Sequence, residues 1–138
     1  MIKPEDLRIG NWIEYDNRYF QIECVSVHFP YLKTAEFGAG VVDWSNMNGI
    51  PLAEKVLLDC GFDQISDTNI YVISMHKIGI NKLKSLAVYI DENSYTAAIV
   101  DYYTGVEKTD LLHMDYQHLH ELQNLFYSLT KTELIIKL

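Results

Sequence analysis

DYQHLHELQNLFYSLTKTEL, residues 115–134, is the stretch that decides the fold. At about 100° per residue its side chains separate into an apolar stripe and a narrow polar strip. A polar strip that narrow predicts a helix sunk into a core and not one resting on its surface. We therefore expect a long C-terminal helix that begins at Asp115, its N-cap, runs to Leu134 and packs on a sheet. The stripe consists of Leu119, Leu122, Leu125, Phe126 and Leu129, widened by Tyr116 and Tyr127, and the opposite strip of Gln117, Glu121, Asn124 and Ser128.

Three polar side chains of this helix lie at or inside the apolar arc. Gln123 falls within it, where an amide must find hydrogen-bond partners or cost about 1–3 kcal/mol. His120 lies on its edge, and Asn124 begins the polar strip. One interpretation is a small binding site where these residues meet the sheet or the N-terminal hairpin. The other, which we favour, is a polar network that ties the helix to irregular backbone and fixes its register.

The N-terminal part predicts a short, strongly bent hairpin. Pro4–Leu7 can form one helical turn, and Trp12–Tyr15 begins a strand. Asp16-Asn17 suits a two-residue turn, because both residue types tolerate positive φ. The returning strand, Arg18–Val27, changes the phase of its apolar alternation, which indicates a bulge or a sharp bend.

Such a hairpin is how small SH3-like barrels begin. Two further strands, at Thr34–Phe37 and Val41–Trp44 around a glycine-rich turn, would complete one. The turn-rich residues 45–49 then mark a boundary, so the single domain 1–138 subdivides into a barrel-like part, 1–48, and an α+β part, 49–138.

The second part predicts a short helix followed by an antiparallel sheet. Pro51 opens the helix, and Gly61 fits the left-handed position after its end. Short turns between the later strands indicate antiparallel neighbours, so the whole chain is predicted to be α+β. The expected strands are Ile70–Met75, Gly79–Leu83, Leu86–Ile90, Tyr95–Tyr102 and a short one at Leu111-Leu112.

Composition excludes several classes of protein. Cys24 and Cys60 are too few for a disulfide framework and lie in no metal-binding spacing. The chain begins without the apolar run of a signal peptide, and no segment approaches the roughly 18 apolar residues of a membrane span. We expect a cytoplasmic protein with no membrane partner.

The net charge of -8 disfavours direct binding to nucleic acid. One local exception is a set of basic residues around two expected strands, which we interpret as the solvent side of those strands. An acidic surface also suits a mimic of DNA, and net charge alone does not separate mimicry from ordinary solubility. The basic residues are His76, Lys77, Lys82 and Lys84.

No catalytic or metal-binding motif is complete. His120-Glu121 resembles the start of the zinc-protease motif His-Glu-x-x-His, but Asn124 stands where the second histidine is needed. His113, His118 and His120 do not share one helical face, and His118 falls within the apolar stripe, as a core histidine would. Cys60 closes a helix, where the dipole raises the pKa of a thiol. We expect no cofactor and no metal.

Aromatic residues offer a different kind of surface. Trp12, Tyr15 and Tyr19 on the hairpin, with Tyr102 and Tyr103 near a strand end, could form a patch for a protein partner. The alternative is that they complete the core and rim of a strand-rich domain.

Three blocks of the chain follow a recognisable pattern. They are LRIGNW at 7–12, GIPL to GF over 49–62, and HELQNLFYSLT to EL over 120–134. Together they resemble an uncharacterised family of small proteins of Bacteroidetes genomes, prophages and mobile elements. The last block is the most specific, and its family form reads HQLQNLYFALTGEEL. The resemblance implies a biological setting and no mechanism.

Two positions depart from that family pattern. The family has Thr where this chain has Ala53, so a helix N-cap worth about 1 kcal/mol is lost. It has Gly where this chain has Lys131. A lysine is strained in the left-handed backbone conformation that ends many helices, so we expect the helix to continue into residues 132–134.

The leading functional hypothesis is a non-enzymatic protein-interaction or structural module of a phage or mobile element. Its partner would be a second copy of the chain, or a host or phage protein. One alternative is a nucleic-acid-associated protein or an acidic DNA mimic. Another is a small enzyme that uses His120 as a base, which requires an imidazole open to solvent and a carboxylate beside it.

Overall fold

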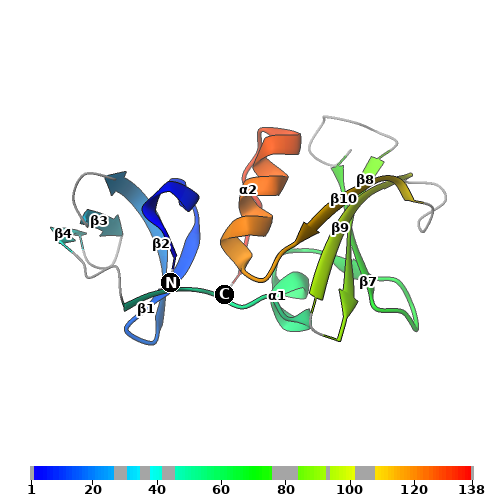
Figure 1. The fold of residues 1–138 in the computed structure, drawn as a ribbon, viewed down its shortest axis with the longest axis horizontal. Coiled ribbons are helices and arrows are strands. Elements are labelled where there is room, and N and C mark those ends of the chain that lie inside the picture. Colours follow the sequence, from blue (N-terminus) through cyan, green and yellow to red (C-terminus); the bar gives the residue numbers. More distant parts are fainter. Residues whose placement is uncertain are drawn as a thin grey trace. The chain divides into compact units, whose positions relative to one another are not determined.

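The computed structural model describes residues 2–26, 31–34, 38–41, 46–75, 84–92, 94–101 and 108–137. Within these residues the chain is α+β, with two five-stranded antiparallel sheets and two α-helices (Figure 1), which confirms the expected class. It divides into two compact units. Unit 1 comprises Met1–Pro51 and His118–Leu125, and unit 2 comprises Leu52–Gln117 and Phe126–Leu138.

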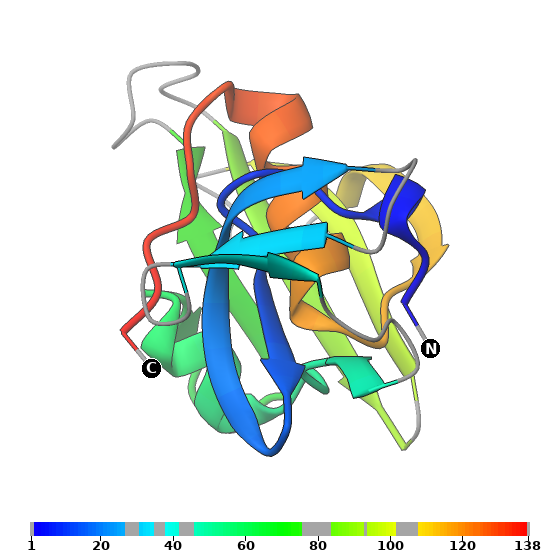
Figure 2. The same cartoon turned by 90° about the vertical axis from the view of Figure 1, so that its left-hand side faces the viewer.

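Unit 1 contains an antiparallel meander in which β1 pairs with both β2 and β5 (Figure 2). Asp16 and Asn17 have φ values of 51° and 59°, so the predicted two-residue turn is confirmed. A register shift between Ile22 and Cys24 in the β2–β3 pairing confirms the predicted bulge. The elements are η1 (Pro4–Asp6), β1 (Trp12–Tyr15), β2 (Arg18–Ser26), β3 (Tyr31–Thr34), β4 (Gly38–Val41) and β5 (Met47–Gly49), with sheet order β4-β3-β2-β1-β5.

Two strands of this sheet lie earlier in the chain than predicted. The glycine-rich stretch expected to be a turn forms β4, and Leu32 pairs there with Gly40. A ladder is made by backbone groups, so an edge strand forms even where side chains are small. The sheet is open, with β4 and β5 at its edges in the described residues, so the SH3-like barrel expected from the sequence is not confirmed. Residues 35–37 and 42–44, which the predicted strands included, lie outside the described ranges.

The core of unit 1 follows from the alternation of the hairpin strands. Ile13 on β1 and Phe20 and Ile22 on β2 are buried, because residues two apart point to the same face. Tyr15 is half-buried and packs against this cluster together with Leu7. The other members of the cluster are Ile2 and Met47.

Unit 2 is an antiparallel meander with a short helix before it. Its strands are joined in chain order, as short turns predict. A buried cluster of Ala87, Ala98 and Val100 lies at its centre. The predicted strand at Gly79–Leu83 lies outside the described residues. The elements are α1 (Glu54–Asp59), β6 (Asp63–Gln64), β7 (Ile70–Ser74), β8 (Lys84–Asp91), β9 (Ser94–Asp101) and β10 (Lys108–Asp115), with sheet order β10-β9-β8-β7-β6.

Helix α1 ends as predicted and begins later than predicted. Gly61 has φ 85°, and its N–H donates to the Leu58 carbonyl at 3.0 Å. The N–H of Phe62 donates to the Leu57 carbonyl at 3.1 Å, which completes a Schellman motif. Pro51 forms an isolated bridge with His118 and is not the first helical residue.

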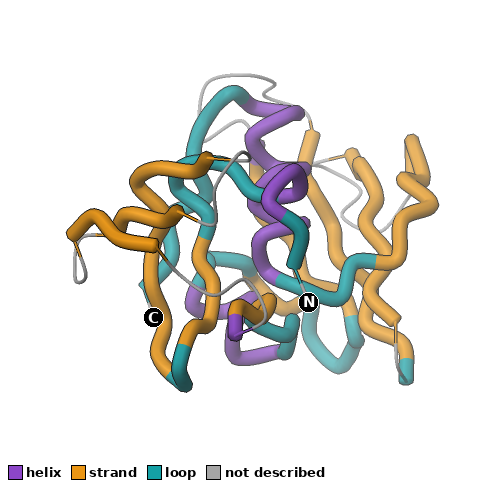
Figure 3. Tube along the Cα trace, turned by 60° about the vertical axis from the view of Figure 1, so that its left-hand side comes forward, coloured by secondary structure: helices purple, strands orange, loops and turns teal. Residues whose placement is uncertain are grey.

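Helix α2 (Leu119–Thr130) is shorter at both ends than the predicted helix (Figure 3). Asp115 is the last residue of β10 and not the N-cap. Lys131 adopts φ 56°, so the predicted continuation into residues 132–134 is wrong. Its N–H donates to the Tyr127 carbonyl at 2.7 Å, and the Thr130 hydroxyl accepts the Thr132 N–H at 3.1 Å. These bonds offset the cost of a left-handed lysine.

The inward face of α2 carries the predicted residues. Leu119, Leu122 and Gln123, which belong to unit 1, and Phe126, which belongs to unit 2, are all buried. The inward orientation predicted for Gln123 is therefore confirmed.

No helix within the described ranges combines the length and apolar character that crossing a membrane requires.

Candidate functional site

Gln123 joins α2 to the start of β1 and to the residues just before it, within unit 1. Its side chain is fully buried. Its Oε1 accepts the backbone N–H of Trp12 at 2.8 Å, and its Nε2 donates to the Gly10 carbonyl at 3.0 Å. Both ends of the amide are thus paired, as a buried amide requires.

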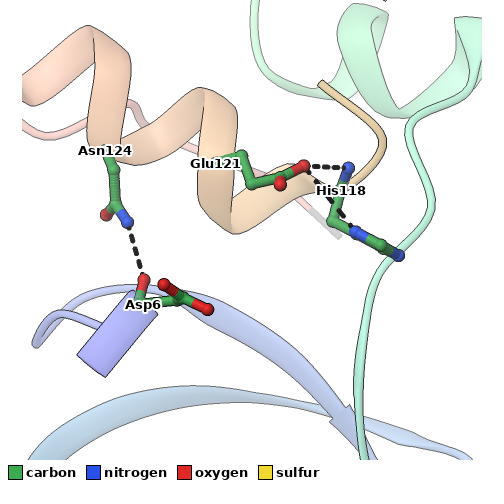
Figure 4. Close-up of polar contacts among 4 residues, drawn as sticks. All are labelled: Asp6, His118, Glu121 and Asn124. Atoms are coloured by element: carbon green, nitrogen blue, oxygen red, sulfur yellow. Dashed lines mark hydrogen bonds and ion pairs between the residues drawn. The ribbon is translucent and has the colours of Figure 1, made fainter. Parts of the chain in front are cut away.

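Asn124 extends the same network. Its Nδ2 donates to the backbone carbonyl of Asp6 at 2.9 Å (Figure 4). Its Oδ1 accepts from the Asn11 amide at 2.9 Å and from the Arg8 Nε at 3.3 Å. Two of the three sequence blocks, 7–12 and 120–134, therefore meet through their polar residues. This geometry supports the favoured interpretation, in which the polar network holds α2 against irregular backbone and fixes the register of the helix.

The two aromatic candidates belong to the framework of unit 1. Trp12 contributes its backbone N–H to Gln123, and its side chain is half-buried. Tyr15 packs on the core cluster. Tyr19, in contrast, is 48% exposed. Tyr102 and Tyr103 lie outside the described residues.

A cavity of about 390 Å³ lies in unit 1, beside the first turn of α2. It brings together residues of η1, β5 and α2 that are far apart in the sequence. His120 is the one candidate from sequence that lines it; Gln123 and Asn124 lie in the network instead. The lining residues are Ile2, Asp6, Asn48, Gly49, His118, His120 and Glu121.

His118 and Glu121 form the N-terminal cap of α2. The Oε2 of Glu121 accepts the backbone N–H of His118 at 2.9 Å and lies 3.7 Å from its Nδ1 (Figure 4). This is the half of a capping box in which the N3 carboxylate reaches back to the N-cap. The prediction that His118 is a core histidine is wrong. Its side chain is 39% exposed, because the helix begins after it.

His120 is the buried histidine of the site. It is 4% exposed, and its Nδ1 has no hydrogen-bond partner among the described residues. Its ring stacks on that of His118, with centroids 5.7 Å apart. Burial lowers the pKa of His120, the carboxylates of Glu121 and Asp6 oppose this shift, and His118 adds to it. The net lowering favours the neutral imidazole, which has one nitrogen free to accept a hydrogen bond.

Gly49 is a residue of the site that sequence reasoning treated only as part of a turn-rich boundary. A Cβ at this position would lie 2.5 Å from the His118 ring and 2.8 Å from the His118 Cβ. Glycine therefore permits β5 to pass directly against His118. The available signal was its place at the start of the GIPL block. Asp6 and Asn48 carried no comparable signal.

Other reactive groups offer less. Over the described ranges, no three histidine, cysteine, aspartate or glutamate side chains gather closely enough to hold a metal ion. Cys60 is buried, and burial followed by the charge of Asp59 raises its pKa to about 12. The direction agrees with the prediction, but the cause is burial and the Asp59 charge and not the helix dipole that the sequence suggested; the thiol is a poor nucleophile.

A second cavity, of about 340 Å³, lies in unit 2 beside the start of α1. Glu54 and Tyr95 are among its lining residues. The Tyr95 hydroxyl donates to the Leu52 carbonyl at 2.6 Å, so it already serves to hold backbone in place. The more reactive set of side chains is the one in unit 1.

No family model matches the chain, and neither a curated protein nor a solved structure shows significant similarity to it.

Proposed function

We propose that the protein is a non-enzymatic protein-interaction or structural module, acting in the cytoplasm in the phage or mobile-element setting that the resemblance implies. The proposal rests on the hydrogen bonds of the polar residues in the sequence blocks. The side chains of Gln123 and Asn124 bond to other residues of the chain and are therefore not presented to a ligand. Apolar side chains, in contrast, remain on the surface.

Ile9 is the strongest candidate contact residue. It is 59% exposed and stands between two residues that are held in place. Gly10 donates its N–H to the Ile22 carbonyl at 2.8 Å, and its carbonyl accepts from Gln123. The Arg8 N–H donates to the Asn11 side chain at 2.6 Å. A side chain presented on a fixed backbone loses little further entropy on binding, which favours its use as an anchor.

The strand order of unit 1 supports a binding module at the level of fold. The order β4-β3-β2-β1-β5, with a bulge in β2, is compatible with the SH3-like barrel expected from the sequence, while the sheet is open within the described residues. Such folds bind peptides through surface side chains without carrying out chemistry. Because a fold hosts many functions, this likeness is secondary to the exposed residue itself.

The test compares Ile9→Ser with Leu58→Ser, which removes a 48% exposed aliphatic side chain from unit 2. Light scattering after size exclusion measures self-association, and affinity capture from the native host measures binding to other proteins. We expect Ile9→Ser to reduce the dimer or the specifically recovered partner, while Leu58→Ser leaves them unchanged. A monomer at all concentrations whose recovered proteins are identical for wild type and Ile9→Ser would overturn the proposal.

The alternatives receive less support. An enzyme that uses His120 as a base requires an exposed imidazole, whereas this one is 4% exposed. Direct binding to nucleic acid is opposed by the net charge of -8. A salt-dependent gel shift with duplex DNA tests direct binding, and co-purification of a nuclease or polymerase tests mimicry.

A further inference from the structure

The cavity of unit 1 has the size and the mixed lining of a small-ligand site. Its volume of about 390 Å³ falls in the range of roughly 300–1,000 Å³ that such sites occupy. Ile2, which is buried, supplies an aliphatic wall. Asp6, Asn48 and the two histidines supply polar groups.

The charges around the cavity are negative. The Glu121 carboxylate already caps α2 through the His118 N–H, so the position that an anion would take at this helix end is filled. Asp6 accepts from Asn124 through its backbone carbonyl (Figure 4). Its carboxylate belongs to an exposed residue and is among the groups that line the cavity. No lysine or arginine is among the lining residues. The local field therefore attracts a cation.

His120 supplies an independent indication of a ligand. A buried imidazole nitrogen without a hydrogen-bond partner is unfavourable, and such a group in a native structure requires an explanation. Burial lowers the pKa of this histidine, so its neutral form can accept a hydrogen bond. Asp6 and Glu121 are both near enough to act on it electrostatically.

We propose that this cavity binds a small organic cation, a primary ammonium or guanidinium group on a short aliphatic stem. Asp6 provides the opposite charge and Ile2 packs against the stem. The Nδ1 of His120, which neighbouring groups cover in this structure, accepts an N–H of the ligand once the ligand displaces them. Asn48 offers an amide oxygen for a further N–H. The site is separate from Ile9 and does not depend on the protein contact proposed above.

The experiment is a titration of the full chain at neutral pH, in which the backbone amide chemical shifts are measured by NMR at each ligand concentration. The probes are n-butylammonium and N-methylguanidinium, with 1-butanol and N-methylurea as uncharged counterparts. We expect saturable shifts at Asn48, Gly49 and His120 with the two cations only. Equal response to the uncharged compounds, or no saturable shift at the highest soluble concentration, overturns the proposal.

A pair of variants separates the site from general attraction to an acidic protein. Asp6→Asn removes the proposed charge partner from an exposed position, so folding is not at risk. Asp16→Asn makes the same change in net charge at an exposed turn residue with φ 51°, which asparagine tolerates. We expect Asp6→Asn to weaken binding about tenfold or more and Asp16→Asn to leave it unchanged. Equal weakening in both variants overturns the proposal.

The same cation could be a free amine or the side chain of a lysine or arginine. N-acetyl-lysine amide and N-acetyl-arginine amide, titrated beside the two simple cations, distinguish these sources. Tighter binding of the amides identifies a side chain of a polypeptide, and tighter binding of the simple cations identifies a free amine. Either result must remain sensitive to Asp6→Asn for the site to stand.

Discussion

Replacing Gln123 with leucine removes the hydrogen-bonding amide and keeps a side chain of similar size. The change leaves the N–H of Trp12 without its partner at 2.8 Å. The Gly10 carbonyl loses one donor and keeps another, the Gln21 amide at 3.2 Å. An orphaned buried donor costs about 1–3 kcal/mol, and because the Gly10 carbonyl keeps a donor we expect a total loss of about 1–3 kcal/mol. This is a large part of the roughly 5–15 kcal/mol that stabilises a domain.

Urea unfolding followed by tryptophan fluorescence measures this loss. With a slope of about 2 kcal/mol per molar urea, the midpoint falls by about 0.5–1.5 M and the slope stays constant. Gln21→Leu is the matched control, because Gln21 is exposed and donates to the same Gly10 carbonyl. Its expected cost is below about 0.5 kcal/mol. If Gln123→Leu is as stable as the control, the network is not what holds α2 in register.

Three further predictions concern single residues. Gly49→Ala should destabilise the protein by about 1–3 kcal/mol in thermal melts, since the new methyl meets the His118 Cβ, which ring rotation cannot move aside. A melt unchanged by this substitution would show that β5 does not pass against His118. Lys131→Gly should raise the unfolding free energy by up to about 1 kcal/mol, because glycine adopts φ 56° without strain. The Lys131 ammonium lies 5.9 Å from the centroid of the Tyr127 ring. An unfolding free energy below that of the wild type would mean that this contact outweighs the backbone strain. The pKa of His120 is lower in the folded than in the unfolded state. Below a pH of about 6.5 the unfolded chain therefore binds more protons at this residue than the folded chain does. The unfolding free energy falls as the pH falls. Urea unfolding between neutral and mildly acidic pH should show a smaller decline for His120→Asn than for the wild type, and equal declines would contradict the lowered pKa.

Local chemistry was sufficient to predict the features that depend on a few neighbouring residues. Asp16 and Asn17 tolerate positive φ, and they form the turn between β1 and β2. Gly61 takes the left-handed position that ends α1. The change of phase after Ile22 became the bulge in β2. Each of these depends on backbone preferences that a short window of sequence contains.

The ends of α2 were mispredicted because tertiary structure overrides local preference there. Asp115 is a good N-cap by type, but it pairs with Thr96 as the last residue of β10. Lys131 is a poor left-handed residue by type, yet Thr130 and Thr132 bond around it and close the helix. Periodicity alone extended the helix across both positions, because apolar residues continue the 3.6-residue spacing on either side.

The candidate site could be predicted only in part, since a helical projection locates a buried polar side chain without identifying its partners. The projection places Gln123 inside the apolar arc and His120 on its edge, and it identifies a hydrogen-bond partner for neither. In three dimensions each polar atom of the Gln123 amide has a backbone partner, whereas the His120 Nδ1 has none among the described residues and its residue lines a cavity with Asp6. A satisfied buried group stabilises a fold, and an unsatisfied one beside a cavity indicates a place for a ligand. The number of partners for each polar atom, which requires coordinates, is therefore what separates the structural network from the proposed cation site.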